Sequence, residues 1–115
     1  MTLPHNHGQE IEKHFEHMPK EESFHVVADV FKLLSDSNRV RIFWMLCHCE
    51  ECVINISALM EMSSPAVSHH LRLPKDNGLI TSRRDGKEVY YKAAETEQAE
   101  MLHQAIEKMA RITCI

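Results

Sequence analysis

Apolar residues recur at helical spacing along most of the chain. Ile11, Phe15 and Met18 follow one another at four- and three-residue steps, which predicts a short amphipathic helix that ends before Pro19. A longer apolar stripe follows and predicts a second helix, which ends at the polar run 35–38. Its apolar positions are Phe24, Val27, Ala28, Phe31 and Leu34.

A third helix is predicted from the polar run onward. Asp36 or Ser37 suits its N-cap, because short polar side chains accept a hydrogen bond from the first free backbone N–H groups. The expected buried face of this helix comprises Val40, Phe43, Leu46 and Cys47.

Two short helices separated by a tight turn are predicted next. Asn55 is the expected N-cap of the first, which runs through Ile56, Leu59 and Met60. Ser63 or Ser64 caps the second, and Pro65 is tolerated at its first helical position. The apolar positions of the second helix are Ala66, Val67 and Leu71.

A β-hairpin and a last helix complete the pattern. Residues 79–84 and 87–92 are rich in β-forming side chains and flank Asp85-Gly86, which is a strong hairpin signal. In the last helix, an apolar seam is formed by Ala99, Leu102, Ile106 and Met109. This seam should pack against another element, and a dimer partner is the simplest candidate. The predicted fold is mainly α with a β-hairpin wing, a dimeric winged helix-turn-helix. Residues 1–20 form a histidine-rich arm and 21–115 the domain.

Charge is distributed unevenly along the chain. The net charge is −4, yet residues 63–93 carry six Lys/Arg and three Asp/Glu, which gives +3. A basic stripe on an acidic protein fits a compact phosphate-contacting face.

Polar residues on the second short helix and the hairpin suit DNA recognition. A helix in the major groove reads base edges with its N-terminal side chains, while a neighbouring wing contacts phosphates. An exposed polar face with no function is the alternative. The candidate DNA-binding residues are Ser64, Ser68, His69 and Arg72 on the helix and Arg83, Arg84 and Lys87 on the hairpin.

Cysteines gather just before the helix-turn-helix. Cys47, Cys49 and Cys52 lie within six residues and, with His48, make a soft donor set suited to Zn²⁺, Cd²⁺ or Pb²⁺. If the third helix continues, Cys49 and Cys52 share a face, whereas Cys47 points about 160° away from Cys49. A single ion is therefore expected to take two of these thiols. The alternative is that Cys47 is a core residue and the others are incidental.

Several classes of protein are not expected. No apolar run is long enough to span a membrane and no signal-peptide pattern is present, so the protein is predicted to be cytoplasmic. Paired carboxylates, a glycine-rich phosphate loop and a nucleophile elbow are lacking, so neither an enzyme nor a small-molecule substrate is expected.

From about Val27 to Ala110 the chain resembles the ArsR/SmtB family of metal-responsive winged-helix repressors. The segments SDSNRVRI, SSPAVSHHLRL and GLITSRRDGKEVYYKA carry this resemblance. It implies a homodimer, held by its terminal helices, that represses an operator until an inducer binds. Pro74 departs from the family pattern, which has an apolar residue there, and the recognition helix is expected to end or kink near Leu73.

The resemblance also implies ligands for the inducer. Cys52 matches the family's most frequent cysteine, and the arm supplies Cys or His ligands, often to the other subunit. The expected ligands here are Cys49, Cys52, His14 and His17, with Cys47, His5 and His7 as further candidates. The family's second metal site is expected to be absent, because its four positions read Glu95, Glu97, Lys108 and Arg111.

Three hypotheses follow. The first is a repressor that releases double-stranded operator DNA on binding Zn²⁺, Cd²⁺ or Pb²⁺. The second is a thiol redox or persulfide sensor on the same fold, using Cys47, Cys49, Cys52 or Cys114. The third is an interaction module that binds no DNA and holds a structural zinc ion.

Overall fold

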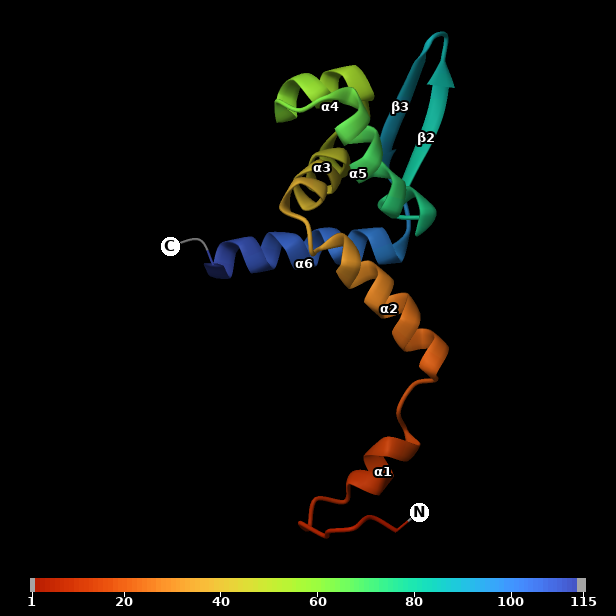
Figure 1. Cartoon of the computed structure of the whole chain (residues 1–115), viewed down its shortest axis with the longest axis vertical. Helices are drawn as coiled ribbons and strands as arrows, with labels where there is room; N and C mark the ends of the chain where they lie inside the picture. The colour runs from red at the N-terminus through yellow and green to blue at the C-terminus, as the bar shows by residue number, and fades with distance from the viewer. Residues whose placement is uncertain (1, 114–115) are drawn as a thin grey trace.

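A computed structural model of the chain describes residues 2–113 and shows a mainly helical fold with a small antiparallel sheet (Figure 1). The fold is the predicted winged helix-turn-helix. The elements, in chain order, are α1 (Ile11–Glu16), α2 (Glu21–Leu33), α3 (Ser37–His48), β1 (Glu51–Cys52), α4 (Val53–Met60), α5 (Ser64–Asp76), β2 (Ile80–Asp85), β3 (Glu88–Ala93) and α6 (Glu97–Thr113).

One apolar core holds α3, α4, α5, the sheet and α6 together. Phe43 of α3 and Ile56 of α4 are almost fully buried in it, and α6 runs across α3 beneath the helix-turn-helix (Figure 1). The core side chains are Leu33, Ile42, Phe43, Leu46, Ile56, Val67, Leu71, Leu79, Ile80, Ala99, Leu102 and Ile106.

The corner between α2 and α3 is held by two residues of the polar run. The Asp36 carboxylate accepts a hydrogen bond from the Arg39 backbone N–H at 3.1 Å, so Asp36 is the N-cap, as predicted. This bond lowers the pKa of Asp36. The Arg39 side chain turns back and donates to the carbonyl oxygens of Leu33 and Lys32 at 3.3 and 2.9 Å. It thereby adds hydrogen bonds to carbonyls in the last turn of α2, where the Lys32 carbonyl also accepts from the Ser35 hydroxyl at 2.7 Å.

The first helix of the helix-turn-helix begins earlier than predicted. Cys52 is the N-cap of α4, and Asn55 lies in the first turn, where its amide donates to Glu51 Oε2 at 2.8 Å. The prediction of Asn55 as N-cap was wrong. Ser63 caps α5 as predicted, because its Oγ accepts from the Ala66 backbone N–H at 3.2 Å.

Pro74 does not end the recognition helix. α5 continues through Pro74 to Asp76, and the Asn77 N–H still donates to the Leu73 carbonyl at 3.1 Å. Of the two expected outcomes, an end or a kink near Leu73, the first was therefore wrong. Proline removes one helical N–H donor and crowds the carbonyl four residues earlier, but this position lies in the last turn and the ring is buried.

The wing is the predicted hairpin with one additional strand. The turn lies one residue later than the predicted Asp85-Gly86, because Asp85 is the last residue of β2 and Gly86-Lys87 join the strands. Gly86 has a φ of 63°, which suits glycine at the first position of a two-residue turn. β1 pairs with β3 through Cys52 and Tyr90, so the strand order is β1-β3-β2. β1 was not predicted, because two residues are too short to show an alternating pattern.

Apolar side chains remain exposed on the terminal helices. The stripe on α2 faces outward at Phe24, Val27 and Phe31, and no residue of α1 is buried. On α6, Ala99, Leu102 and Ile106 pack into the core of their own chain, so the seam expected to meet a dimer partner is mostly internal. The large apolar side chains that α6 leaves exposed are those of Met101, Met109 and Ile112. None of the helices within residues 2–113 is long and apolar enough to cross a membrane.

Candidate nucleic-acid interface and metal ligands

The candidate DNA-reading residues of α5 lie on its solvent side. Ser68, His69 and Arg72 are exposed, and Ser64 in the first turn is half-buried. Val67 and Leu71 occupy the opposite face and are buried in the core. The helix is thus fixed by its apolar face and presents one polar face that is free to enter a groove.

The wing carries the three predicted cations, one of which has a partner in its own chain. Arg84 and Lys87 are exposed. Arg83 donates to Glu50 from Nη2 at 2.6 Å and from Nε at 3.0 Å, and its guanidinium lies 4.8 Å from the centre of the Tyr90 ring. The hydrogen bonds from Arg83 lower the pKa of Glu50. Glu50 was missed by sequence reasoning, because it lies 33 residues from Arg83 and meets it only in the folded sheet.

The cysteines do not share a helical face. α3 ends at His48, so Cys49 is in extended backbone and Cys52 is in β1. The predicted helical pairing of Cys49 and Cys52 is therefore wrong. Cys49 is exposed, its Sγ lying 3.3 Å from the Met45 carbonyl oxygen, whereas Cys52 is only 7% exposed. Cys114 lies outside the described residues.

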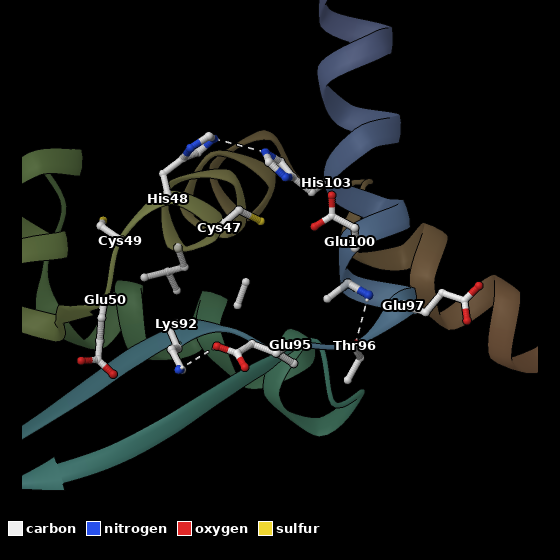
Figure 2. A pocket seen from close by; sticks show the side chains of 14 residues that line it. Cys47, His48, Cys49, Glu50, Lys92, Glu95, Thr96, Glu97, Glu100 and His103 are labelled. Carbon is white, nitrogen blue, oxygen red and sulfur yellow. Dashed lines mark hydrogen bonds and ion pairs between the residues drawn. The ribbon is translucent and has the colours of Figure 1, made fainter.

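Cys47 lines a cleft of about 540 Å³ between α3, the start of α6 and the loop that follows β3 (Figure 2). Cys47 and Cys49 point in different directions in this view. Burial raises the pKa of the Cys47 thiol to about 11, and the carboxylates of Glu100 and Glu107 add to the effect. Cys47 is therefore held as a neutral thiol at neutral pH.

Iodoacetamide is expected to modify Cys49 well before Cys47 at about pH 8, since the thiolate is the nucleophile and Cys49 is exposed. Because the pKa of Cys47 is about 11, its rate should rise with pH through the alkaline range. Peptide mass mapping at several pH values measures both rates, with urea-unfolded protein as the control. Equal rates in the folded protein would contradict the assigned environments.

The arm histidines lie away from the cysteines within one chain. His14 is on α1 and His17 is its C-cap, and both are exposed. Figure 1 shows α1 at the far end of the chain from the helix-turn-helix. His5 and His7 stack on each other with ring centres 5.9 Å apart. The chain by itself therefore does not bring the expected ligand set together.

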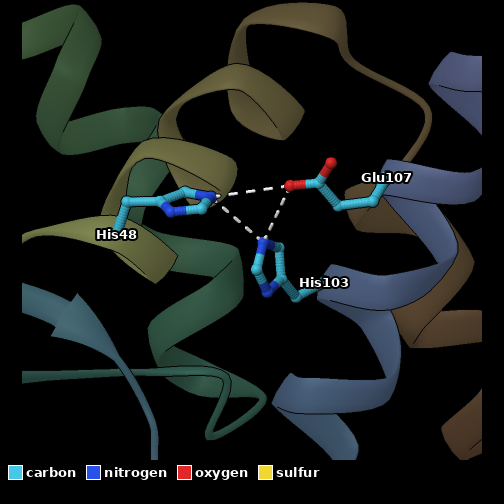
Figure 3. Close-up of side chains that lie close together, drawn as sticks. All are labelled: His48, His103 and Glu107. Atoms are coloured by element: carbon cyan, nitrogen blue, oxygen red, sulfur yellow. Dashed lines mark hydrogen bonds and ion pairs between the residues drawn. The ribbon is translucent and has the colours of Figure 1, made fainter.

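A different set of donors does meet. His48 at the end of α3 and His103 of α6 approach with their Nε2 atoms 3.1 Å apart. Glu107 Oε1 lies 3.2 Å from the Nε2 of His103 and 3.6 Å from that of His48 (Figure 3). Trp44 donates to the same oxygen at 2.9 Å, and this bond, with His103, lowers the pKa of Glu107. His103 and Glu107 at i and i+4 were a signal in the sequence. His48 was expected as a donor beside the cysteines, but nothing local paired it with His103, which lies 55 residues away.

Comparison with protein families gives one match over the helix-turn-helix. Residues 36–82 match the family described as "Bacterial regulatory protein, arsR family". The match extends from the N-cap of α3 to the first half of β2.

Three curated relatives are regulators by name, and two of them are named for resistance to a metal or metalloid. A cadmium resistance regulator CadC homolog of Staphylococcus aureus is 40% identical over 80 residues, which are 69% of this chain and 66% of that protein. The SmtB repressor homolog of Synechocystis is 39% identical over 60% of this chain and 52% of its own. The arsenical resistance operon repressor of Escherichia coli is 35% identical over 61% of each chain. The chain thus spans about half to two thirds of these relatives.

Solved structures share the whole fold. The homodimeric winged helix-turn-helix DNA-binding domain Mb0332 of Mycobacterium bovis, a possible regulator, matches with a TM-score of 0.72 at 26% identity, over 85% of this chain and 92% of that one. HlyU of Vibrio cholerae matches with a TM-score of 0.69 at 27% identity, over 84% of this chain and 100% of that one.

Proposed function

The chain belongs to the ArsR family of bacterial regulatory proteins, and from this premise we propose that it is a cytoplasmic, dimeric repressor that releases its operator when it binds a soft or borderline metal ion. The observation that carries the proposal is the exposed polar face of α5, fixed beside a basic wing, with Cys49 and Cys52 just before α4, the first helix of the same helix-turn-helix. The relatives named for cadmium and arsenical resistance support a metal or metalloid as inducer.

In this proposal α5 enters the major groove. Ser64, Ser68, His69 and Arg72 reach base edges, since hydroxyl, imidazole and guanidinium groups all hydrogen-bond there. On the wing, Arg84 and Lys87 contact phosphates beside the groove, and Arg83 does so only if it leaves Glu50.

Dimerisation buries the apolar side chains that α2 and α6 leave exposed. Phe24, Val27 and Phe31 on α2 and Met101 and Ile112 on α6 are each 45–71% exposed in the single chain. Large apolar surfaces of this kind mark interaction sites. The homodimeric state of the Mycobacterium bovis domain supports a second copy of the chain as the partner.

The inducer site combines Cys49 and Cys52 with His14 and His17 of the partner subunit's arm. Thiolate and imidazole donors fit Zn²⁺, Cd²⁺ or Pb²⁺. Cys52 is the N-cap of α4, and the positive end of a helix favours a metal-bound thiolate there. His5 and His7 are further candidates. Cys47 is the weakest, because the pKa of its thiol is raised to about 11 and its side chain points away from that of Cys49 (Figure 2).

Release of the operator requires that the metal prefer the DNA-incompetent form of the dimer. A coupling of about 1–3 kcal/mol, typical of allosteric proteins, corresponds to a loss of about 5- to 150-fold in operator affinity. A metal that joins the arm of one subunit to the N-terminus of α4 in the other fixes the position of the two α5 helices relative to each other. This constraint supplies such a preference.

Titration of Cd²⁺, Zn²⁺ or Pb²⁺ is expected to lower operator affinity about 5- to 150-fold while thiolate-to-metal charge-transfer absorbance appears at the same stoichiometry. The DNA is a labelled fragment selected from a random pool by the purified protein, and its anisotropy reports binding. A Cys49→Ser/Cys52→Ser variant should bind the fragment but lose both responses, whereas Cys47→Ser should retain them. Unchanged operator affinity with all three metals would refute metal sensing.

A thiol redox sensor is the alternative that the same titration separates. Reversible oxidation of Cys49 that weakens operator binding, with no effect of metals, would favour it. The geometry argues against a Cys47–Cys49 disulfide, because the two side chains point in different directions (Figure 2).

A further inference from the structure

We propose that His48, His103 and Glu107 form a binding site for a divalent cation of the Zn²⁺ class at the junction of α3 and α6. The site uses no thiol and stands whether or not the cysteines bind an inducer. Its three ligand atoms come from two elements that pack on each other within one chain.

The spacing of the ligand atoms fits a tetrahedral ion. Bonds of about 2.0–2.1 Å from Zn²⁺ to imidazole nitrogen and carboxylate oxygen place neighbouring ligand atoms about 3.3 Å apart. The three separations here are 3.1, 3.2 and 3.6 Å. Only small side-chain movements are needed to equalise them.

Hydrogen bonds alone satisfy this arrangement poorly. A neutral imidazole has one N–H, so the contact between the two Nε2 atoms requires one to donate and the other to accept. If His103 donates from Nε2, its single proton is shared between His48 and Glu107. If His48 donates, the lone pair of His103 Nε2 faces the Glu107 carboxylate. A cation placed between the three atoms interacts favourably with every one of them.

The surroundings hold the ligands in place. Trp44 donates to Glu107 Oε1 at 2.9 Å, and its ring centre lies 4.3 Å from that of His48. Such outer contacts orient ligand side chains in metal sites. His103 is only 20% exposed, whereas His48 and Glu107 are 47% and 43% exposed, so the remaining coordination position is open to water. An ion bound here joins the helix that leads into the cysteines to the helix proposed for dimerisation.

A variant without thiols tests the site directly. Cys47→Ala/Cys49→Ser/Cys52→Ser/Cys114→Ser is expected to bind one Co²⁺ per chain, with the visible absorbance of tetrahedral Co²⁺ and no thiolate charge transfer. Zn²⁺ should displace the Co²⁺. Trp44 is the single tryptophan of the chain, so its fluorescence should change at the same stoichiometry.

Ligand variants are made in the same background, with circular dichroism as the folding check. His103→Gln and Glu107→Gln should each weaken Co²⁺ binding at least about tenfold, the lower end of the losses seen even for outer-sphere changes. Gln at position 107 keeps an acceptor for Trp44, so this variant separates ligation from folding. His25→Gln is the matched control, because His25 pairs with Glu21 four residues earlier, with no third ligand within residues 2–113, and its replacement should have no effect.

The proposal is overturned if the thiol-free protein folds and binds neither Co²⁺ nor Zn²⁺, or if His103→Gln and Glu107→Gln bind Co²⁺ as tightly as their parent. Neither outcome affects the cysteine site, which is judged in the wild-type chain by charge-transfer absorbance and operator release. Conversely, loss of the inducer response in Cys49→Ser/Cys52→Ser leaves the histidine site intact.

Discussion

A variant with both His69 and Arg72 replaced by alanine is expected to fold normally and to bind operator DNA about a hundredfold more weakly. Both side chains are exposed on α5 and contribute nothing to the core. A good base contact is worth about 1–3 kcal/mol, and counting one such contact from each subunit of a dimer, at about 1.4 kcal/mol, gives about 2.8 kcal/mol, or a factor of about 100. Anisotropy of labelled operator measures the change.

Lys20→Ala is the control for this variant, because it removes a cation from the segment that precedes α2, far from the reading face. Its effect on operator affinity should be small. Affinity for non-specific DNA should fall much less in the double variant than affinity for the operator. Wild-type operator affinity in a folded His69→Ala/Arg72→Ala protein would refute the assignment of α5 as the reading helix.

Phe31→Glu is expected to shift the protein from dimer to monomer, with a dimer dissociation constant about a thousandfold higher. Phe31 is 62% exposed in the single chain, so the change has little effect on its own core. Interface anchors contribute about 2 kcal/mol or more. A symmetric interface contains each residue twice, and the total of about 4 kcal/mol corresponds to that factor. Analytical ultracentrifugation measures the constant.

Leu59→Glu is the matched control for the interface. Leu59 is 63% exposed, almost the same as Phe31, but it lies on α4 of the reading unit. It should leave the oligomeric state unchanged, even if it alters operator binding. If the Phe31→Glu protein dimerises at the same concentrations as the wild-type protein, the α2 face is not the interface.

Local signals in the sequence predicted most of the fold. The Asp36 and Ser63 caps, the apolar faces of α3 and α5 and the two-residue hairpin loop each depend on neighbours within a few positions. Such features are readable because the chemistry that forms them is local. The end of α5 was predicted wrongly for a related reason. The sequence shows that a proline at position 74 lacks the N–H for a helical hydrogen bond, but it does not show that the ring of Pro74 is buried.

The candidate site was less predictable, because its geometry depends on distant contacts. Extension of α3 through Cys52 would have placed Cys49 and Cys52 on one face, but α3 ends at His48 and Cys52 pairs with β3 as part of β1. His48 and His103 are 55 residues apart, and only the packing of α3 on α6 brings them together. The arm histidines were readable as possible donors, but within one chain they lie far from Cys49 and Cys52, so a site that combines them needs a second subunit (Figure 1).

The ion pair between Glu50 and Arg83 also bears on how operator binding responds to salt. Each DNA phosphate neutralised by a protein cation releases condensed counterions and adds about 0.9 to the slope of log affinity against log salt concentration. A guanidinium that already faces a carboxylate displaces few counterions from DNA. In the proposed complex, Glu50 therefore lowers the contribution of each wing to the affinity for DNA of any sequence. More of the discrimination between sites is then left to α5.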